Sequence, residues 1–332
     1  GLWKWDNGRE ILAAYTEAPY EKKEGMHNIG NPRLSKLVRS MDGGNTWAVE
    51  DPENFVGKEK KTVPSPGNIH FGHPNFALRV SATGYHANND AAGRFFISYD
   101  RGKTWEGPFR FNELQKIREL EGLEITSRTS YLITGENSAQ IFMTARNPKL
   151  RYGNRRDKPF VLETTDGGMT FNFVTWIVPW SDQDNRAVMP SVVRTQDNKL
   201  VVAVRVRNPR NTNLPCWIDS YISENNGRTW SFLSKVGETG LDNGNPPALA
   251  ALKDGRIACG YANRTTYQIL VRYSNDNGVT WSEANVIRDN PYSNDMGYPQ
   301  LTQNDDGKLV AVYYITTEKH PDNYIESAIW KP

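Results

Sequence analysis

Residues 40–47 read SMDGGNTW, a stretch that joins the residues of a tight turn to an aromatic side chain. Asp42 can accept hydrogen bonds from backbone N–H groups two residues on, and Gly44 supplies the positive φ that closes a hairpin. Thr46 then begins the next strand, and Trp47 can bury a large apolar area against a neighbouring sheet. The stretch therefore predicts a turn between two antiparallel strands, in which the Asp is structural rather than catalytic.

The same pattern occurs five times along the 332 residues. The copies are residues 40–47, 98–105 (SYDRGKTW), 164–171 (TTDGGMTF), 223–230 (SENNGRTW) and 274–281 (SNDNGVTW). Each copy follows the previous one after 51 to 66 residues. A nearly fixed period of this size is typical of a radial or solenoid array of repeats.

A second repeat, made of two β-rich runs joined by a polar turn, accompanies the first. It covers residues 189–207, 246–264 and 298–315, and residues 2–15 follow the same pattern. Asp-Gly and similar turn residues between alternating apolar runs are a strong hairpin signal. Each unit is therefore predicted to hold four antiparallel strands, with the first repeat as the turn between its third and fourth strands.

Six such units begin near Leu2, His73, Arg128, Met189, Asn245 and Tyr298. Radial repetition of four-stranded sheets is a β-propeller, so the sequence predicts an all-β fold, a six-bladed β-propeller in a single domain over residues 1–332. The sixth unit lacks the turn and ends in residues 324–330, so its outer strand is expected to come from residues before Leu2 or to be missing. An export signal is also expected upstream, which predicts a secreted or periplasmic protein.

The composition is that of a globular protein, with 37% hydrophobic and 23% charged residues. No apolar run approaches the roughly 20 residues that span a bilayer, so no membrane insertion is expected. The formal net charge is +2 and the basic runs are interrupted, which argues against nucleic acid as a partner. Neither Cys216 nor Cys259 has a Cys or His at metal-site spacing, so no metal site and no cofactor are predicted.

In a four-stranded meander, the first and third turns lie at one end of the sheet. The other end carries the beginnings of the innermost strands and the loops after the second strands, and loops on a rigid scaffold concentrate binding chemistry. Beginnings of innermost strands nominate His73, Arg128, Met189, Asn245 and Tyr298. Ends of second strands nominate Tyr15, Glu17, Arg146, Arg205, Arg207, Arg264 and Glu318.

Arginines are prominent among these positions. Arg205 and Arg207 are two residues apart on one predicted strand, so they share a face. A guanidinium group binds a carboxylate through two hydrogen bonds, and a cluster of arginines therefore indicates an anionic ligand. The alternative for any single arginine is a solvated or ion-paired side chain at a strand end.

Four other residues are candidates for chemistry. Tyr298 begins the innermost strand of the last unit, although packing is the alternative role for such a residue. His73 and His27, the latter in the loop after residue 17, are candidate general acids or bases. Glu17 closes the second strand of the first unit beside that loop, and it is the carboxylate that we expect to donate a proton.

The five turns resemble the Asp box of the sialidase (neuraminidase) superfamily, and the resemblance extends over the whole chain through the repeats. Enzymes of that superfamily are retaining glycosidases in which a Tyr is the nucleophile, an Asp is the acid and base, and three arginines hold the substrate carboxylate. A Tyr nucleophile avoids repulsion between the sugar carboxylate and an attacking carboxylate. The resemblance therefore implies a six-bladed propeller that acts on a glycan.

Some positions match that family's motifs and others depart from them. Residues 297–301, GYPQL, resemble the last-blade strand that carries the Tyr, while Arg205 and Arg264 resemble the second and third arginines. The family's Arg-Ile-Pro signature would precede Leu2. Met189-Pro190 stands where the family has Asn-Glu, and residues 17–32 contain three Glu but no Asp.

These patterns lead to one main functional hypothesis and two alternatives. The main one is an exo-acting, sialidase-like glycoside hydrolase on an acidic or complex glycan. Its catalytic candidates are Tyr298, Glu17 and His73, and its substrate-binding candidates are Arg128, Arg205, Arg207, Arg264, Asn245 and His27. The alternatives are a polysaccharide lyase that acts on a uronate-containing glycan and a non-catalytic propeller that binds glycan or protein.

Overall fold

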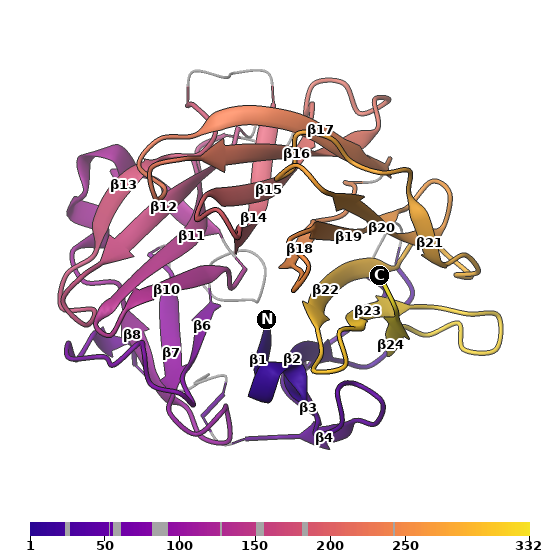
Figure 1. Ribbon diagram of the computed structural model, residues 1–332, viewed down its shortest axis with the longest axis horizontal. Helices are drawn as coiled ribbons and strands as arrows, with labels where there is room; N and C mark the ends of the chain where they lie inside the picture. Colours follow the sequence, from indigo (N-terminus) through magenta and orange to yellow (C-terminus); the bar gives the residue numbers. More distant parts are fainter. Residues whose placement is uncertain are drawn as a thin grey trace. The chain divides into compact units, whose positions relative to one another are not determined.

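The structure of the protein is a computed structural model that describes residues 1–23, 27–52, 54–55, 61–81, 92–126, 128–150, 156–180, 185–241 and 243–332. The regular structure of these residues is almost entirely β-sheet, with the short 3-10 helices η1 (Asp6–Gly8), η2 (Leu114–Lys116) and η3 (Arg118–Leu120). The strands form six small sheets, and the fold is a six-bladed β-propeller, as predicted (Figure 1). None of the helices in the described ranges is long and apolar enough to span a membrane.

The chain divides into two compact units. Unit 1 comprises residues 1–51, 212–220 and 233–332, and unit 2 comprises residues 52–211 and 221–232. One sheet contributes strands to both units. It consists of β14 (Arg186–Arg194), β15 (Leu200–Arg207), β16 (Cys216–Ser223) and β17 (Ser231–Gly240).

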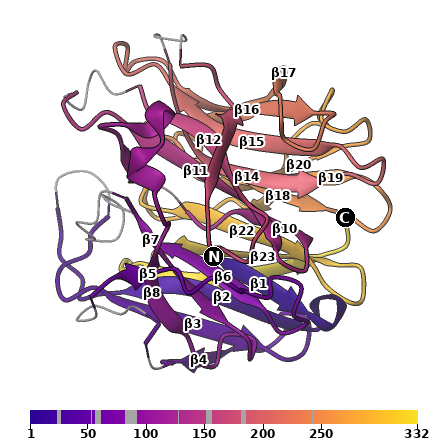
Figure 2. The ribbon, with the colours of Figure 1, turned by 90° about the vertical axis from the view of Figure 1, so that its left-hand side faces the viewer.

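Unit 1 holds three complete sheets with strands in simple up-and-down order. The first, seen from the side in Figure 2, consists of β1 (Leu2–Trp5), β2 (Glu10–Glu17), β3 (Leu34–Ser40) and β4 (Ala48–Glu50). The second consists of β18 (Ala248–Ala251), β19 (Ile257–Asn263), β20 (Gln268–Ser274) and β21 (Asn285–Arg288). The third has three strands among the described residues, β22 (Gly297–Gln303), β23 (Leu309–Ile315) and β24 (Tyr324–Trp330), in line with the turn that its sequence lacks.

Unit 2 holds two further sheets. One consists of β5 (Val63–Pro64), β6 (Ala77–Ser81), β7 (Arg94–Ser98) and β8 (Glu106–Arg110), in the order β5-β8-β7-β6. The other consists of β10 (Tyr131–Gly135), β11 (Ser138–Arg146), β12 (Lys158–Thr164) and β13 (Asn172–Trp176), with β9 (Glu124–Thr126) paired to β11.

Each unit has its own apolar core. In unit 1, the sheets β18–β21 and β22–β24 bury a shared cluster that includes Val271, Met296, Leu309 and Ile315. In unit 2, the core between the sheets is rich in phenylalanine, and the rings of Phe95 and Phe111 lie 4.9 Å apart. Burial of such apolar area is the main favourable term in folding.

The start of the second of the six predicted four-stranded repeats was wrongly placed at His73. β6 pairs with β7, the strand that enters the turn at residues 98–105, so β6 is the second strand of its sheet, not the first. No strand among the described residues lies on the other side of β6. The residue before a proline is disfavoured in regular helix and favours turns, and the Phe76 N–H donates to the His73 carbonyl in such a turn around Pro74.

All five repeated motifs form a turn between two consecutive antiparallel strands, as predicted. In four sheets the second of these strands is the outer one, whereas β8 lies between β7 and β5. The hydrogen bonds differ from the expected ones. In the first turn the Ser40 hydroxyl donates to Asp42 Oδ1 (2.8 Å) and accepts the Gly44 N–H (2.8 Å). Asp42 in turn accepts the N–H (2.9 Å) and the hydroxyl (2.6 Å) of Thr46, four residues on rather than two. Hydroxyl and carboxylate together thus close the turn without using the strand ladder.

The other turns repeat this network with equivalent residues. Asp100, Asp166 and Asp276 each accept the N–H and the hydroxyl of the Thr four residues on. In the fourth turn Asn225 Oδ1 accepts the Thr229 N–H (2.9 Å), and its Nδ2 donates to the Thr229 hydroxyl (2.8 Å). An amide therefore replaces the carboxylate without loss of the network.

These hydrogen bonds make four of the turns sensitive to acid. The Thr46 hydroxyl, followed by the Thr46 N–H and the Ser40 hydroxyl, lowers the pKa of Asp42 from 3.8 to about 2. Burial alone would raise the pKa of Asp100, Asp166 and Asp276, but the hydrogen bonds from threonine outweigh it and the pKa of each is lowered. A carboxyl group whose pKa is lower in the folded state stabilises the fold above its unfolded pKa, and this contribution is lost as the pH falls through the folded value.

We therefore expect the urea midpoint of unfolding to fall as the pH decreases from about 4 to about 2. Asp42→Asn should show a smaller decrease over this range, because the amide keeps the turn, as Asn225 does, and does not titrate. Urea titrations at pH 5, 4, 3 and 2 measure the difference. An identical pH dependence in Asp42→Asn and the unsubstituted protein would contradict the role of the turn carboxylate.

Candidate active site around Tyr298

The backbone at the start of β22 has an unusual conformation. Gly297 has a φ of 116° and Tyr298 a φ of 52°, and the pairing of β22 with β23 shifts register between Gly297 and Gln300. A side chain other than glycine is strained at positive φ, and such strain gathers at functional sites. Bulges next to active sites re-aim a side chain, and this one determines how Tyr298 is presented.

Two polar side chains from neighbouring segments hold this backbone. Asn245 Oδ1 accepts the Tyr298 N–H (2.6 Å), and Asn245 Nδ2 donates to the Met296 carbonyl (3.2 Å). Arg264 donates to the same carbonyl through Nε (3.3 Å) and Nη2 (3.2 Å), and to the Gly244 carbonyl through Nη1 (3.0 Å). Asn245 and Arg264 are almost completely buried. Both were predicted to bind substrate, which stays a prediction, and their described contacts fix the backbone that carries Tyr298.

Arg264 also contacts the aromatic side chains. Its Cζ lies 5.5 Å from the centroid of the Tyr298 ring, within the range of a cation–π contact. Its Nη2 donates to the Tyr314 hydroxyl (2.9 Å). One guanidinium group therefore joins the loop before β18, the bulge of β22 and the end of β23.

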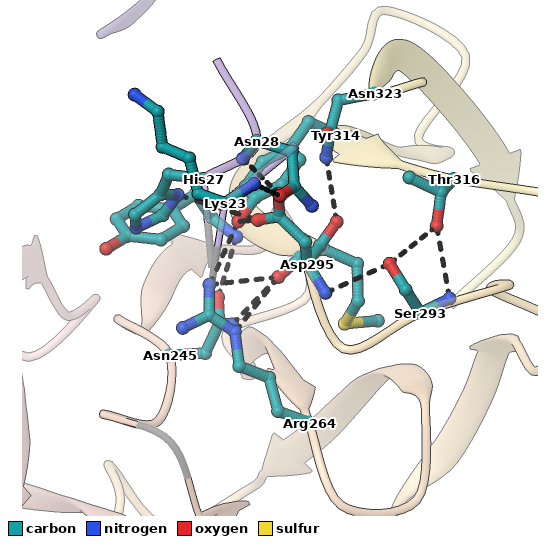
Figure 3. Close-up of polar contacts among 12 residues, drawn as sticks. Lys23, His27, Asn28, Asn245, Arg264, Ser293, Asp295, Tyr314, Thr316 and Asn323 are labelled. Carbon is teal, nitrogen blue, oxygen red and sulfur yellow. Dashed lines mark hydrogen bonds and ion pairs between the residues drawn. The ribbon is translucent and has the colours of Figure 1, made fainter. Parts of the chain in front are cut away.

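Asp295 lies at the centre of the polar contacts (Figure 3). Its Oδ1 accepts the Tyr314 hydroxyl (3.0 Å), and its Oδ2 accepts the Asn28 N–H (3.0 Å). Its backbone is fixed as well, because Asn323 Nδ2 donates to the Asp295 carbonyl (2.8 Å). A buried carboxylate needs such donors, and only 1% of the Asp295 side chain is exposed.

The hydroxyl of Tyr314 connects Arg264 to Asp295. Burial raises the pKa of Tyr314 well above its usual value, and the nearby Asp295 carboxylate adds to this against the opposing effect of Arg264. Tyr314 therefore remains a neutral phenol that accepts from Arg264 and donates to Asp295.

His27 reaches the same place from the loop after β2. Its Nδ1 lies 3.5 Å from Asp295 Oδ1, and its ring stands edge-on to Tyr298 with the centroids 5.9 Å apart. The imidazole is 47% exposed. The loop is held beside it by Lys23, whose Nζ donates to the Ile29 carbonyl (2.7 Å). We call the six residues Tyr298, His27, Asp295, Tyr314, Arg264 and Asn245 the Tyr298 cluster, and all of them belong to unit 1.

Glu17 does not join the described contacts of this cluster. It is exposed at the end of β2, where it faces Leu34 across the ladder. Its carboxylate interacts with the Tyr15 phenol, and after burial it is the next cause that raises the pKa of Tyr15. The prediction that Glu17 donates the proton gains no support from these contacts and stays a prediction.

His73 lies at the turn end of its sheet in unit 2. Its neighbour Asn75 accepts the N–H of Arg101 (3.0 Å), which belongs to the repeated turn at residues 98–105. His73 was nominated because it was expected to begin an innermost strand at the other end. The structure therefore removes the reason for that nomination.

The remaining predicted arginines also belong to unit 2. Arg128 is half-buried just before β10. Arg205 and Arg207 are buried on β15, and Arg207 faces Arg186 of β14. Arg186 Nη2 lies 2.7 Å from Asp157 Oδ2, so a carboxylate that the sequence did not single out pairs with the ladder partner of Arg207.

Sequence reasoning missed Asp295 and Tyr314. Tyr314 faces Gly297 at the end of β23, a second strand, so the rule that nominated Arg205 and Arg264 could have found it. Asp295 precedes the bulge by three residues in an irregular segment, and no spacing distinguishes it from Asp289. No group of His, Cys, Asp and Glu that could hold a metal ion is found in the part of the chain that the structure describes.

A groove of about 460 Å³ lies apart from the cluster, between β21 and β24. Val286, Ile287, Ala328 and Trp330 contribute to its lining, and neither a histidine nor a carboxylate side chain does. The chemistry-bearing residues therefore lie in the Tyr298 cluster and not in this groove.

Fold and site together define a six-bladed β-propeller with an aromatic and polar cluster at a strained strand start. The sequence model of the BNR repeat-like domain family matches residues 76–311, and the chain belongs to that family. No curated protein sequence matches the chain.

Solved structures with the same fold are similar at low identity. A protein of unknown function from Dyadobacter fermentans has a TM-score of 0.71 at 18% identity, covering 98% of this chain and 92% of that one. The α-L-arabinanase of Penicillium chrysogenum has a TM-score of 0.63 at 15% identity, covering 99% and 92%. The Hadza microbial sialidase Hz136 has a TM-score of 0.63 at 13% identity, covering 99% and 64%. Likeness at such identities shows the fold.

The bulge that carries Tyr298 requires glycine at position 297. A Cβ at Gly297 would overlap side-chain atoms of Asn245, and φ is unfavourable for any residue other than glycine. We expect Gly297→Ala to lower the free energy of unfolding by about 1 to 3 kcal/mol. Urea denaturation measures this effect.

Gly260→Ala is the matched control in the same unit. A Cβ at Gly260 would meet only ordinary contacts at 3.5 Å or more, so the stability should change little. Equal effects of the two substitutions would contradict the proposed constraint at the bulge.

Proposed function

We propose that the protein is a sialidase-like glycoside hydrolase and that the Tyr298 cluster is its active site. The observation that carries the proposal is the strained, half-buried Tyr298, whose backbone is fixed by Asn245 and whose ring is flanked by Arg264 and His27. Aromatic rings beside a few fixed polar groups are typical of ligand sites. The likeness of the fold to an arabinanase and a sialidase supports a glycan as the substrate.

The cluster is suited to retaining hydrolysis with Tyr298 as the nucleophile. Tyr298 Oη would attack the anomeric carbon while the bond to the leaving-group oxygen breaks, and water would then cleave the Tyr–sugar bond. The phenol proton passes to a base, and the leaving oxygen takes a proton from an acid. Tyr nucleophiles are a known exception to the use of two carboxylates by glycosidases.

An acidic ligand is the finer part of the proposal, and unit 2 by itself holds an arginine whose chemistry favours an anion. Arg205 is 4% exposed, and its Nη1 has no hydrogen-bond partner among the residues that the structure describes. A buried guanidinium is costly without an acceptor. A ligand carboxylate would satisfy Arg205 through charge-assisted hydrogen bonds.

The test is digestion of a panel of linear arabino-oligosaccharides, sialyl-oligosaccharides, neutral plant oligosaccharides and uronate-containing oligosaccharides. We expect at least one to be cleaved, with Tyr298→Phe lowering kcat/KM at least about a thousandfold through loss of the nucleophile. Tyr267→Phe is the matched control, because Tyr267 also has a positive φ (55°) and is 42% exposed at a turn of the same unit. Its activity should be unchanged. Product analysis by mass spectrometry measures the cleavage.

The other outcomes separate the alternatives. Products with ultraviolet absorbance from an unsaturated sugar would favour elimination by a lyase. Binding of a panel member that remains intact would favour a non-catalytic propeller. Full activity of Tyr298→Phe on a cleaved glycan would overturn the assignment of this site.

A further inference from the structure

We propose that His27 is the proton donor and acceptor of this site and that the buried Asp295 is its positioning residue. The inference rests on the proposed function, because it names the acid and base of the same cluster. The sequence nominated His27 as a candidate general acid or base but did not nominate Asp295, and no Asp is present in residues 17–32.

The geometry of the pair supports this division of roles. Asp295 is 1% exposed, and both of its oxygens already accept hydrogen bonds, from the Tyr314 hydroxyl and the Asn28 N–H. It is therefore poorly placed to touch a substrate. His27 is 47% exposed, and its Nδ1 is the ring atom that lies 3.5 Å from Asp295 Oδ1.

A carboxylate beside Nδ1 favours the ring form in which Nδ1 carries a proton. Nε2, across the ring, is then the nitrogen that exchanges protons with a ligand. The same logic governs the carboxylate and histidine of hydrolytic triads, where the carboxylate orients the imidazole and stabilises its charged form. Catalytic hydrogen bonds are often long without substrate, which suits the 3.5 Å separation of the pair.

Each charged or titratable group around His27 has described partners of its own. Lys23, on the same loop, donates to the Ile29 carbonyl and lies 3.6 Å from Glu21. Arg264 is directed to the carbonyls of Met296 and Gly244 and to Tyr314. Tyr314 donates to Asp295, and the Tyr298 ring packs against the imidazole. Asp295 is thus an anion that faces His27, with Oδ1 3.5 Å from Nδ1.

Protons are conserved over the two steps, formation of the Tyr–sugar bond and its hydrolysis. In the first step the imidazolium Nε2–H passes its proton to the glycosidic oxygen, which keeps the electron pair of the breaking carbon–oxygen bond. The Tyr298 phenol passes its proton to a solvent water as its oxygen forms the new bond to the anomeric carbon. In the second step neutral Nε2 takes a proton from the attacking water. The Tyr298 oxygen leaves with its electron pair and takes a proton back from solvent.

The pairing itself is testable without any substrate. The chain has five histidines, and long-range ¹H–¹⁵N spectra of ¹⁵N-histidine-labelled protein report which ring nitrogen of each neutral imidazole carries the proton. The His27 signal is assigned by its loss in His27→Gln. We expect the Nδ1–H form for His27, and a shift of the proton to Nε2 in Asp295→Asn, because an amide can present an N–H to Nδ1.

Asp289→Asn is the matched control, since Asp289 is exposed in the same segment between β21 and β22. It should leave the His27 signal unchanged. An Nε2–H form in the unsubstituted protein, or a His27 signal that Asp295→Asn does not alter, would overturn the pairing. Thermal unfolding of each variant identifies any loss of the fold, and His27→Gln, at an exposed position, keeps the test valid if Asp295→Asn does not fold.

The proton-transfer role is tested on the glycan that the panel identifies as cleaved. A general acid raises kcat most when the leaving group is poor. His27→Gln should lower kcat about 10² to 10⁴-fold on the natural glycan, and much less on the 2,4-dinitrophenyl glycoside of the same sugar, whose leaving group needs no proton. Asp295→Asn should show the same dependence on the leaving group, and the double variant should be little worse than His27→Gln.

Equal losses on both substrates would show that His27 does not donate the proton. His70→Gln, a histidine of unit 2 outside the cluster, should behave like the unsubstituted protein. If no glycan in the panel is cleaved, the proposed function and the proton-transfer role fail together, whereas the spectra still decide whether Asp295 pairs with His27.

Discussion

The closure of each turn by a hydroxyl and an Asp or Asn side chain is the interaction on which the sheets depend. In every copy the hydroxyl of the first residue accepts the glycine N–H, and the third residue accepts the N–H of the threonine. These polar groups lie where the strand ladder ends and would otherwise need water or another partner. The network uses side chains that are near in sequence, so it can form within each sheet and fix which strands are adjacent.

A different constraint shapes the candidate site. The carbonyl of Met296 accepts three hydrogen bonds from Arg264 and Asn245, and this arrangement allows the chain to enter β22 through two residues with positive φ. Buried polar groups of this kind are stable only when they are satisfied. Arg264 and Asn245 therefore matter for the orientation of Tyr298, because they fix the backbone that leads into it.

The strand pattern was predictable because turn chemistry and apolar alternation are local. The exception is the second sheet, where residues 68–75 have β-rich and turn residues interleaved, and the turn at Pro74 replaces the expected beginning of an innermost strand. Tyr298, His27, Arg264 and Asn245 were found by their places at strand starts, strand ends and one loop. Glu17 and His73 were chosen by the same rule, and the described contacts of the cluster include neither of them.

The sequence by itself determined the number of blades, the position of each repeated turn and the fold class. These features follow from turns whose hydrogen bonds join residues two to four apart, so a local pattern reveals them. Only the tertiary structure decided that Asp295 and Tyr314 complete the cluster and that Arg264 serves the backbone. Asp295 is 267 residues from Asn28 and 19 from Tyr314, and its significance comes from these hydrogen bonds. No local sequence pattern predicts which donors surround a buried carboxylate. These donors come together only when segments distant in the chain pack against each other.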